Sequence, residues 1–172
     1  MLFYVVKQFF NLMDNRVILN KYAINYLSKY NTSKKNLEKI LRNKIRRMNL
    51  EKKEKFVLYN SVESIITELE SKKIINDKYY TESKIRNFSL QGKSKYFIKS
   101  YLVLKGIEKD LIKNTLKNFE LENPDWEMKS AKIFIRKKRL GMKDAKNMKK
   151  DLAKMANAGF DYNISKKTLG FD

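Results

Sequence analysis

The segment from Pro124 to Lys129 carries the residue types of a metal-dependent nuclease, two carboxylates followed by a lysine. In such enzymes these groups come from neighbouring strands and converge on Mg²⁺. Here a single residue separates Asp125 from Glu127, and Asn123-Pro124 is typical of a helix start, with Asn123 at the N-cap and Pro124 at the first helical position. We therefore expect a helix cap here and no catalytic site.

Other catalytic chemistry is limited by composition. The chain contains no cysteine and no histidine, which excludes disulfides, thiolate or imidazole metal sites and a histidine general base. Its five glycines are scattered, so no glycine-rich loop can cradle a phosphate. We expect no cofactor, no metal and no enzymatic activity.

Basic residues dominate the remaining chemistry. Among 172 residues, 39 Lys and Arg stand against 19 Asp and Glu, a formal net charge of +20. Residues 34–55 hold 10 basic and 3 acidic residues, and residues 129–154 hold 11 and 2. In the first segment the cations recur at helical spacing on the face opposite Leu37 and Leu41. The candidate partner-binding or DNA-binding residues are Lys35, Lys39, Arg42, Arg46, Arg47, Lys132, Arg136, Lys137, Arg139, Lys146, Lys149, Lys150 and Lys154.

Two interpretations of these cations remain open at this stage. They attract DNA phosphates or an acidic protein groove, or they are the solvated surface of a lysine-rich chain. Lysine outnumbers arginine, which favours loose phosphate contact over bidentate reading of bases. The ten tyrosines could stack on bases, but most fit the apolar faces of helices, and we expect them in the core.

The elements that carry these residues are predicted to be helices. Apolar residues recur at i, i+3, i+4 and i+7, and the chain has only five glycines and one proline. We expect an all-α fold of three tandem three-helix repeats that form an elongated, curved protein. The expected divisions are an N-terminal apolar helix at 1–18 and repeats at 19–76, 77–122 and 123–172.

Helix ends have their own signals. Thr32-Ser33 and Asp77 are predicted N-caps for the helices that follow them. Gly106 and Gly159 are predicted to end helices as left-handed residues, each followed by a hydrophobic residue, in the Schellman arrangement. The N-terminal stripe of Leu2, Val6, Phe9 and Met13 could cover a core. It is too short and too interrupted for a membrane span, and it lacks the pattern of a signal peptide, so we expect a cytoplasmic protein without a membrane contact.

The order of these features resembles the RecX family, bacterial proteins that regulate the RecA recombinase. The resemblance covers residues 22–169. It is carried by Tyr22-Ala-Ile-Asn-Tyr26-Leu27 with Leu37–Leu41, by the junction from Leu69 to Tyr80, by Lys105-Gly106-Ile107, and by Ala131–Arg139 with Gly159-Phe160. The chain has Lys73 and Asn76 where family members usually have a glycine and an acidic residue, and Ala158 where a basic residue is common.

The resemblance implies a monomer that lies in the groove of the RecA–DNA filament and limits filament growth, ATP hydrolysis and strand exchange, in DNA repair, homologous recombination and the SOS response. Two other classes of function remain open. One is an autonomous, non-specific binder of single- or double-stranded DNA, and the other is a ribonucleoprotein or chromatin-type packing protein held by charge.

Overall fold

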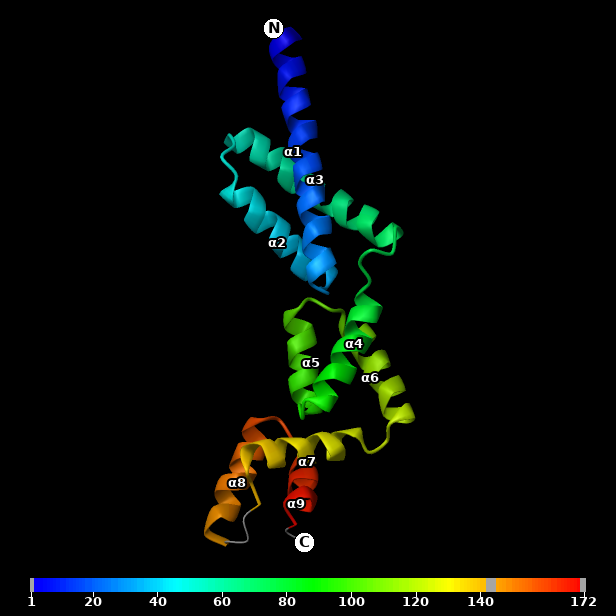
Figure 1. Ribbon diagram of the computed structural model, residues 1–172, viewed down its shortest axis with the longest axis vertical. Coiled ribbons are helices and arrows are strands. Elements are labelled where there is room, and N and C mark those ends of the chain that lie inside the picture. The colour runs from blue at the N-terminus through cyan, green and yellow to red at the C-terminus, as the bar shows by residue number, and fades with distance from the viewer. Residues whose placement is uncertain (1, 142–144, 171–172) are drawn as a thin grey trace. The chain divides into compact units, whose positions relative to one another are not determined.

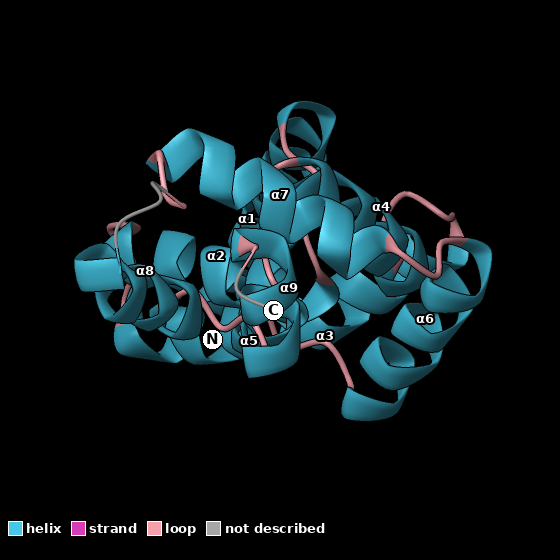
Figure 2. Cartoon of the chain, turned by 90° about the horizontal axis from the view of Figure 1, so that it is seen from below, coloured by secondary structure: helices cyan, strands magenta, loops and turns pink. Residues whose placement is uncertain are grey.

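The computed structural model describes the backbone of residues 2–141 and 145–170 and the side chains of residues 14–141 and 147–170. Within these ranges every regular element is a helix, which confirms the predicted all-α class (Figures 1 and 2). The helices are α1 (Leu2–Lys29), α2 (Lys34–Arg47), α3 (Lys52–Ser71), α4 (Asp77–Leu90), α5 (Lys95–Leu104), α6 (Lys109–Glu122), α7 (Trp126–Lys138), α8 (Ala145–Asn157) and α9 (Tyr162–Leu169). Among the residues described, no helix combines the length and the apolar character that crossing a membrane requires.

The chain forms two compact units, Met1–Tyr80 and Thr81–Asp172. In the first unit, α1, α2 and α3 pack against one another around a shared core (Figure 1). The apolar stripes of the three helices are buried because they recur at helical spacing. Their buried members are Leu19, Ala23, Leu37, Leu41, Ile45, Leu58, Val62, Ile65 and Leu69.

The predicted boundary at residue 18 falls inside α1, which runs without a break from Leu2 to Lys29. The predicted stripe of Leu2, Val6, Phe9 and Met13 lies outside the side chains that the structure describes. Leu19 and Ala23, further along the same helix, are buried in the core of the unit.

The second unit buries two successive groups of apolar residues. Ile98 and Leu102 of α5 are buried, as are Ile112 and Leu116 of α6, which packs against α5. Further along the chain, α9 packs against α7 and α8. The core of these three helices contains Ala131, Leu140, Met155, Phe160 and Leu169.

The two predicted glycine caps are confirmed. Gly106 has φ +74°, and the Ile107 N–H donates to the Leu102 carbonyl at 3.1 Å. Gly159 has φ +83°, and the Phe160 N–H donates to the Met155 carbonyl at 3.1 Å. Both are Schellman arrangements, in which only a left-handed residue lets the chain satisfy the last carbonyls of the helix.

Two further helices end in the same way without glycine. Lys73 (φ +57°) follows α3 and Arg139 (φ +51°) follows α7. The next N–H in each case donates back over five residues, from Ile74 to Leu69 and from Leu140 to Ile135. A residue with a Cβ is strained in this conformation by about 1 kcal/mol or more, so the tertiary structure imposes it here.

The predicted N-cap of α2 is confirmed, and that of α4 is wrong. The Ser33 hydroxyl accepts from the Asn36 N–H. For α4, the Asn76 side chain accepts from the Tyr79 N–H at 3.0 Å, and Asp77 is already helical. Asp77 instead accepts from the backbone N–H of Lys34, at 2.8 Å, and so caps the distant helix α2.

The predicted start at Asn123-Pro124 is also wrong. Asn123 is the C-cap of α6, residues 124–125 form a turn, and α7 begins at Trp126. The Trp126 side chain is buried and lies edge-on to Phe119, with ring centroids 5.7 Å apart. Burial of this aromatic side chain, more than proline chemistry, determines where the helix begins.

A pair of contacts made by one lysine, which we call the clasp, occurs once in each unit. In the first unit Lys34, the first residue of α2, donates its backbone N–H to Asp77 and its ammonium to Glu70 at 2.8 Å. In the second unit Lys95, the first residue of α5, donates its N–H to Glu127 at 2.9 Å and its ammonium to Glu120 at 2.6 Å.

The two acids of each clasp are separated by the same number of residues, and each lysine directly follows a serine N-cap, Ser33 or Ser94. Glu127 is partly buried, and this burial raises the pKa of its carboxyl against the opposing effect of the Lys95 N–H and charge. One capping arrangement thus recurs at α2 and at α5, and the predicted division into three repeats stays a prediction.

Gly159 is required for two reasons: its positive φ, and the close approach of its backbone to Ser94 and Tyr96. A Cβ built there lies 2.8 Å from the Ser94 hydroxyl oxygen and 2.9 Å from Cδ1 of Tyr96, whereas one built on Gly170 (φ +76°) meets nothing within 4 Å. We expect Gly159→Ala to destabilise the protein by about 2 kcal/mol or more and Gly170→Ala, which has only the conformational strain, by about 1 kcal/mol, measured by urea unfolding. Equal effects of the two substitutions would contradict this account of the α5–α8 contact.

Candidate partner-binding surfaces

The cations predicted on the first basic segment share one exposed face of α2. Lys35, Lys39, Arg42, Arg46 and Arg47 are all exposed, and we call them the α2 basic face. The opposite side of the helix is buried, since its apolar residues recur every three or four positions and lie in the core of the unit. The predicted separation of a cationic face and an apolar face is therefore confirmed for this helix.

One acid organises part of this face. Glu38 accepts from the Lys35 ammonium at 2.8 Å and from the Arg42 guanidinium at 2.9 Å. The hydrogen bond from Lys35 is the main cause that lowers the pKa of the Glu38 carboxyl, while partial desolvation opposes it. The Arg42 guanidinium also lies 5.8 Å from the centre of the Tyr59 ring.

The other three cations of the α2 basic face remain available. Among the described residues, no carboxylate forms an ion pair with Lys39, Arg46 or Arg47. The Arg46 carbonyl accepts from the Lys55 ammonium at 3.1 Å, which places a further cation next to it. Unpaired and exposed cations attract phosphates or carboxylates of a partner at little desolvation cost.

The second basic segment divides between two helices and a cap. Lys132, Arg136 and Lys137 are exposed on α7, and the Lys137 ammonium donates to the Gln91 carbonyl at 3.1 Å. Arg139 is exposed too, but it is the left-handed cap residue and not part of the helix face on which we expected it.

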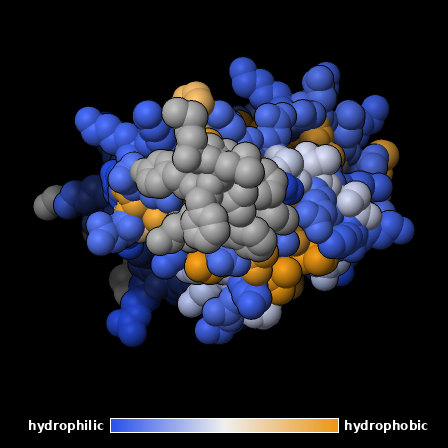
Figure 3. Space-filling model, turned by 90° about the horizontal axis from the view of Figure 1, so that it is seen from above, coloured by the Kyte–Doolittle hydropathy of each residue, from blue (hydrophilic) through white to orange (hydrophobic). Residues whose placement is uncertain are grey.

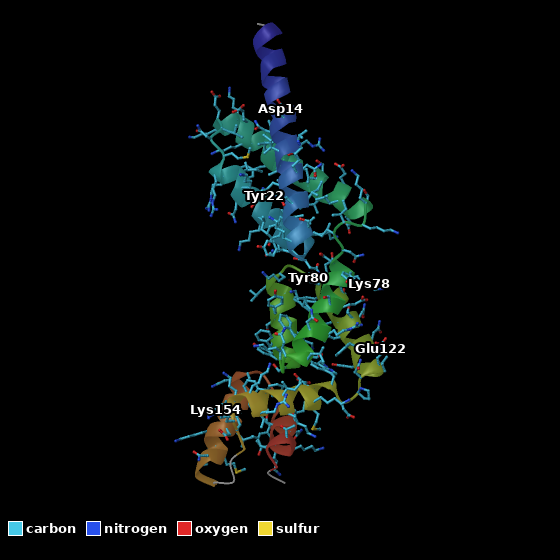
Figure 4. All side chains as sticks on the ribbon, viewed as in Figure 1. Asp14, Tyr22, Lys78, Tyr80, Glu122 and Lys154 are labelled. Carbon is cyan, nitrogen blue, oxygen red and sulfur yellow. The ribbon has the colours of Figure 1, made fainter. Side chains whose placement is uncertain are left out.

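On α8, Lys149, Lys150 and Lys154 are exposed, and Lys154 is labelled in Figure 4. The predicted residue Lys146 lies outside the side chains that the structure describes. We group these three lysines with the exposed basic residues of α7 and its cap and call the set the unit-2 basic surface: Lys132, Arg136, Lys137, Arg139, Lys149, Lys150 and Lys154.

The sequence analysis missed Asp151 because one of its partners, the Gly141 N–H, lies ten residues away and outside the helix. Its carboxylate is buried, accepts from the Gly141 N–H at 2.9 Å and pairs with the Lys154 ammonium at 3.0 Å. The Gly141 hydrogen bond is the main cause that lowers the pKa of Asp151, with burial acting against it. This acid joins the loop after α7 to α8 beneath the unit-2 basic surface.

The tyrosines divide differently from the prediction. Tyr80 is buried, and Tyr22, Tyr26, Tyr59 and Tyr101 are partly buried, as expected. The expectation is wrong for four others that are exposed: Tyr30, Tyr79, Tyr96 and Tyr162. Tyr4 lies outside the described side chains.

In the part of the chain that the structure describes, the surface groups identified above are charged and aromatic side chains. No group of three acidic residues converges there as a metal site would require. On the face drawn in Figure 3, hydrophilic side chains surround smaller hydrophobic areas. The arrangement can hold anionic groups and stack planar ones, and it defines an all-α protein with exposed cationic surfaces.

Comparison with known proteins agrees with this description. No model of a known protein family matches the chain. Over 158 residues the chain is 29% identical to the Regulatory protein RecX of Myxococcus xanthus (strain DK1622), a match that covers 88% of this chain and 83% of that protein.

Two solved structures share the fold. The crystal structure of RecX from Lactobacillus salivarius has a TM-score of 0.68 at 24% identity, covering 92% of this chain and 96% of that one. A second crystal structure of a regulatory protein RecX has a TM-score of 0.66 at 19% identity, covering 94% and 74%. The predicted resemblance to the RecX family is thus confirmed in both sequence and fold.

The lowered pKa of Asp151 predicts a pH-dependent contribution to stability. The folded carboxylate binds protons less readily than the unfolded one, so its stabilisation is present above the unfolded pKa of about 3.9 and is lost as pH falls through the folded value. We expect Asp151→Asn to lower the urea midpoint at pH 7 and to cost progressively less as pH falls through the acid range. A deficit that is constant across this range would show that Asp151 acts by packing alone.

Proposed function

We propose that this protein is a negative regulator of the RecA recombinase, which binds the RecA–DNA filament groove and limits filament growth, ATP hydrolysis and strand exchange. The observation that carries the proposal is the match to a RecX protein along most of both chains, joined to exposed cationic surfaces in each unit. The role is one of binding, without catalysis or a cofactor, by a cytoplasmic monomer.

The exposed positive charges are complementary to a partner that contains both nucleic acid and protein. Lys39, Arg46 and Arg47 have no carboxylate partner among the described residues, so they can pair with phosphates or with acidic side chains of a filament. In this proposal the α2 basic face and the unit-2 basic surface are the regions that contact the filament. Long lysine side chains set few geometric demands, which fits a partner that presents repeated anionic groups.

A second function, non-specific DNA binding without the recombinase, is favoured by the predominance of lysine. The whole chain has many more lysines than arginines, and lysines are the majority of the unit-2 basic surface, although three of the five members of the α2 basic face are arginines. Lysine contacts a phosphate as a point charge and reads no base edge. The two functions differ in how much protein they require.

Substoichiometric inhibition separates the two. A protein that blocks a growing filament end prevents many later additions, so we expect it to reduce RecA ATP hydrolysis and strand exchange at far less than one copy per recombinase, with single-stranded DNA in excess. Competition for DNA alone would need enough protein to coat the strand. If inhibition disappears when DNA is in excess, the regulator proposal is wrong.

Charge reversal tests the proposed surfaces. We expect Lys39→Glu with Arg46→Glu, and separately Lys132→Glu with Arg136→Glu, to weaken inhibition about tenfold or more while leaving helicity and unfolding midpoint nearly unchanged, because all four side chains are exposed. The matched control is Lys113→Glu with Lys117→Glu, two exposed residues on α6 outside both surfaces. Equal inhibition by both surface variants and the control would show that the contact lies elsewhere.

Duplex binding by the free protein should be weak and independent of sequence. If about four phosphates are engaged, log K should fall with log salt at a slope of about −3.6. The measurement is fluorescence anisotropy on two unrelated duplexes over a salt series. A strong preference for one duplex at physiological salt would favour an autonomous, sequence-reading DNA-binding protein instead.

A further inference from the structure

A cavity of about 560 Å³ lies in the first unit, where the end of α1 meets the segment between α3 and α4. Its wall includes Lys29 and Tyr30 from one side and Lys73, Ile74 and Tyr79 from the other. Tyr30 is 57% exposed and Tyr79 is 66% exposed, so both rings are accessible to a ligand from solvent. Neither basic surface described above includes any of these residues.

The chemistry of the wall is aromatic and cationic. Tyr79 and Tyr30 both expose aromatic surface, and Tyr30 also packs at a tilt against Tyr26, with ring centroids 5.0 Å apart. Ile74 is 44% exposed, and Lys29 and Lys73 provide positive charge. None of the described residues that line the cavity is acidic. A ligand complementary to these lining residues has a planar ring that stacks on the tyrosines and a negative charge that lies near the lysines.

Lys73 supplies an independent reason to expect a ligand. Its φ of +57° is imposed by the helix end, where the Ile74 N–H donates to the Leu69 carbonyl at 2.9 Å. Glycine would take this conformation without strain, whereas a residue with a Cβ is destabilised by about 1 kcal/mol or more. A strained residue whose side chain lines a cavity is the pattern expected when the side chain has a use that offsets the strain.

The C-terminal end of α1 narrows the range of ligands that the cavity can bind. The last carbonyls of a helix carry a partial negative charge and have free acceptor capacity. These carbonyls repel a phosphate because both carry negative charge. They attract an N–H donor, such as the ring imide or the exocyclic amine of a nucleic-acid base. Lys29 and Lys73, which line the cavity from the two segments, then hold the phosphate.

We propose that this cavity binds an unpaired nucleotide of a single nucleic-acid strand, with its base against Tyr30 and Tyr79 and its phosphate held by Lys29 and Lys73. Thr32 lines the cavity and Lys35, at the start of the α2 basic face, follows three residues later. The cavity and that face are thus adjacent in the sequence. The site is a property of the free protein and does not depend on the regulation of a recombinase.

The test uses the full chain, no recombinase, and a labelled oligothymidylate of about eight nucleotides, within the range that one small domain contacts. Tyr79→Ala removes one exposed ring and should weaken binding about fivefold or more, as the loss of a stacked base does. A strand that carries 5-iododeoxyuridine should photo-crosslink to Tyr30 or Tyr79. Crosslinks confined to residues outside the cavity would overturn the assignment.

Lys73→Gly is expected to change stability and strand affinity in opposite directions. Relief of the strained conformation should raise the unfolding midpoint, while loss of the cation should weaken binding of the strand about threefold or more. The control Lys78→Ala removes the same charge from an exposed residue at the start of α4 that does not line the cavity, and should change affinity less than twofold (Figure 4). If Lys73→Gly is more stable and still binds like the parent, the proposal is wrong.

Competition identifies the form of the ligand. We expect unlabelled single strand to displace the probe at much lower concentration than duplex of the same length or thymidine monophosphate, since only the strand offers both an accessible base and adjacent phosphates. Displacement by duplex at an equal concentration would overturn the role of base stacking. Displacement by the mononucleotide at an equal concentration would overturn the role of a strand.

Discussion

The structure depends on how the first backbone N–H groups of two helices, α2 and α5, find hydrogen-bond partners. The first N–H groups of a helix have no partner within it, and they carry a partial positive charge. At α2 and at α5 the helix also begins with a lysine, which adds a full positive charge to the same place. A carboxylate two helices further along the chain accepts from the backbone N–H, and a second one, from the next helix, pairs with the ammonium.

This arrangement explains how a chain of such high charge folds. Several of its few acids are paired within the protein: Glu70 and Asp77 in one clasp, Glu120 and Glu127 in the other, and Asp151 of α8 with the Gly141 N–H. Acids used in this way are not distributed over the surface to neutralise it. Apart from Lys35, Arg42 and Lys154, which pair with Glu38 or Asp151, the cations of the two basic surfaces have no carboxylate partner among the described residues and can interact with solvent or with an anionic partner.

Close backbone approach is the second constraint on the fold. Gly92 and Gly159 both have positive φ, and a Cβ on either would come within 3.0 Å of another element: Ile133 and Phe134 of α7 for Gly92, and the start of α5 for Gly159. Ser94 and Ser130 complete this contact by donating hydroxyl hydrogen bonds to the Ala158 and Lys93 carbonyls. Small residues and paired hydroxyls thus join α4 and α5 to the last three helices of the second unit.

The sequence by itself determined the features that depend on neighbours three or four positions apart. The all-α class, the burial of Leu37 and Leu41, the exposure of Lys39 and Arg46 and the glycine caps all follow from helical periodicity or from one residue's allowed conformation. Only the tertiary structure decided which helix Asp77 caps, where α7 begins, which tyrosines are exposed and why Lys73 is left-handed. Those outcomes depend on groups that lie far apart in the chain, such as Lys34 and Asp77, and no local pattern encodes which of many carboxylates will reach a given N–H.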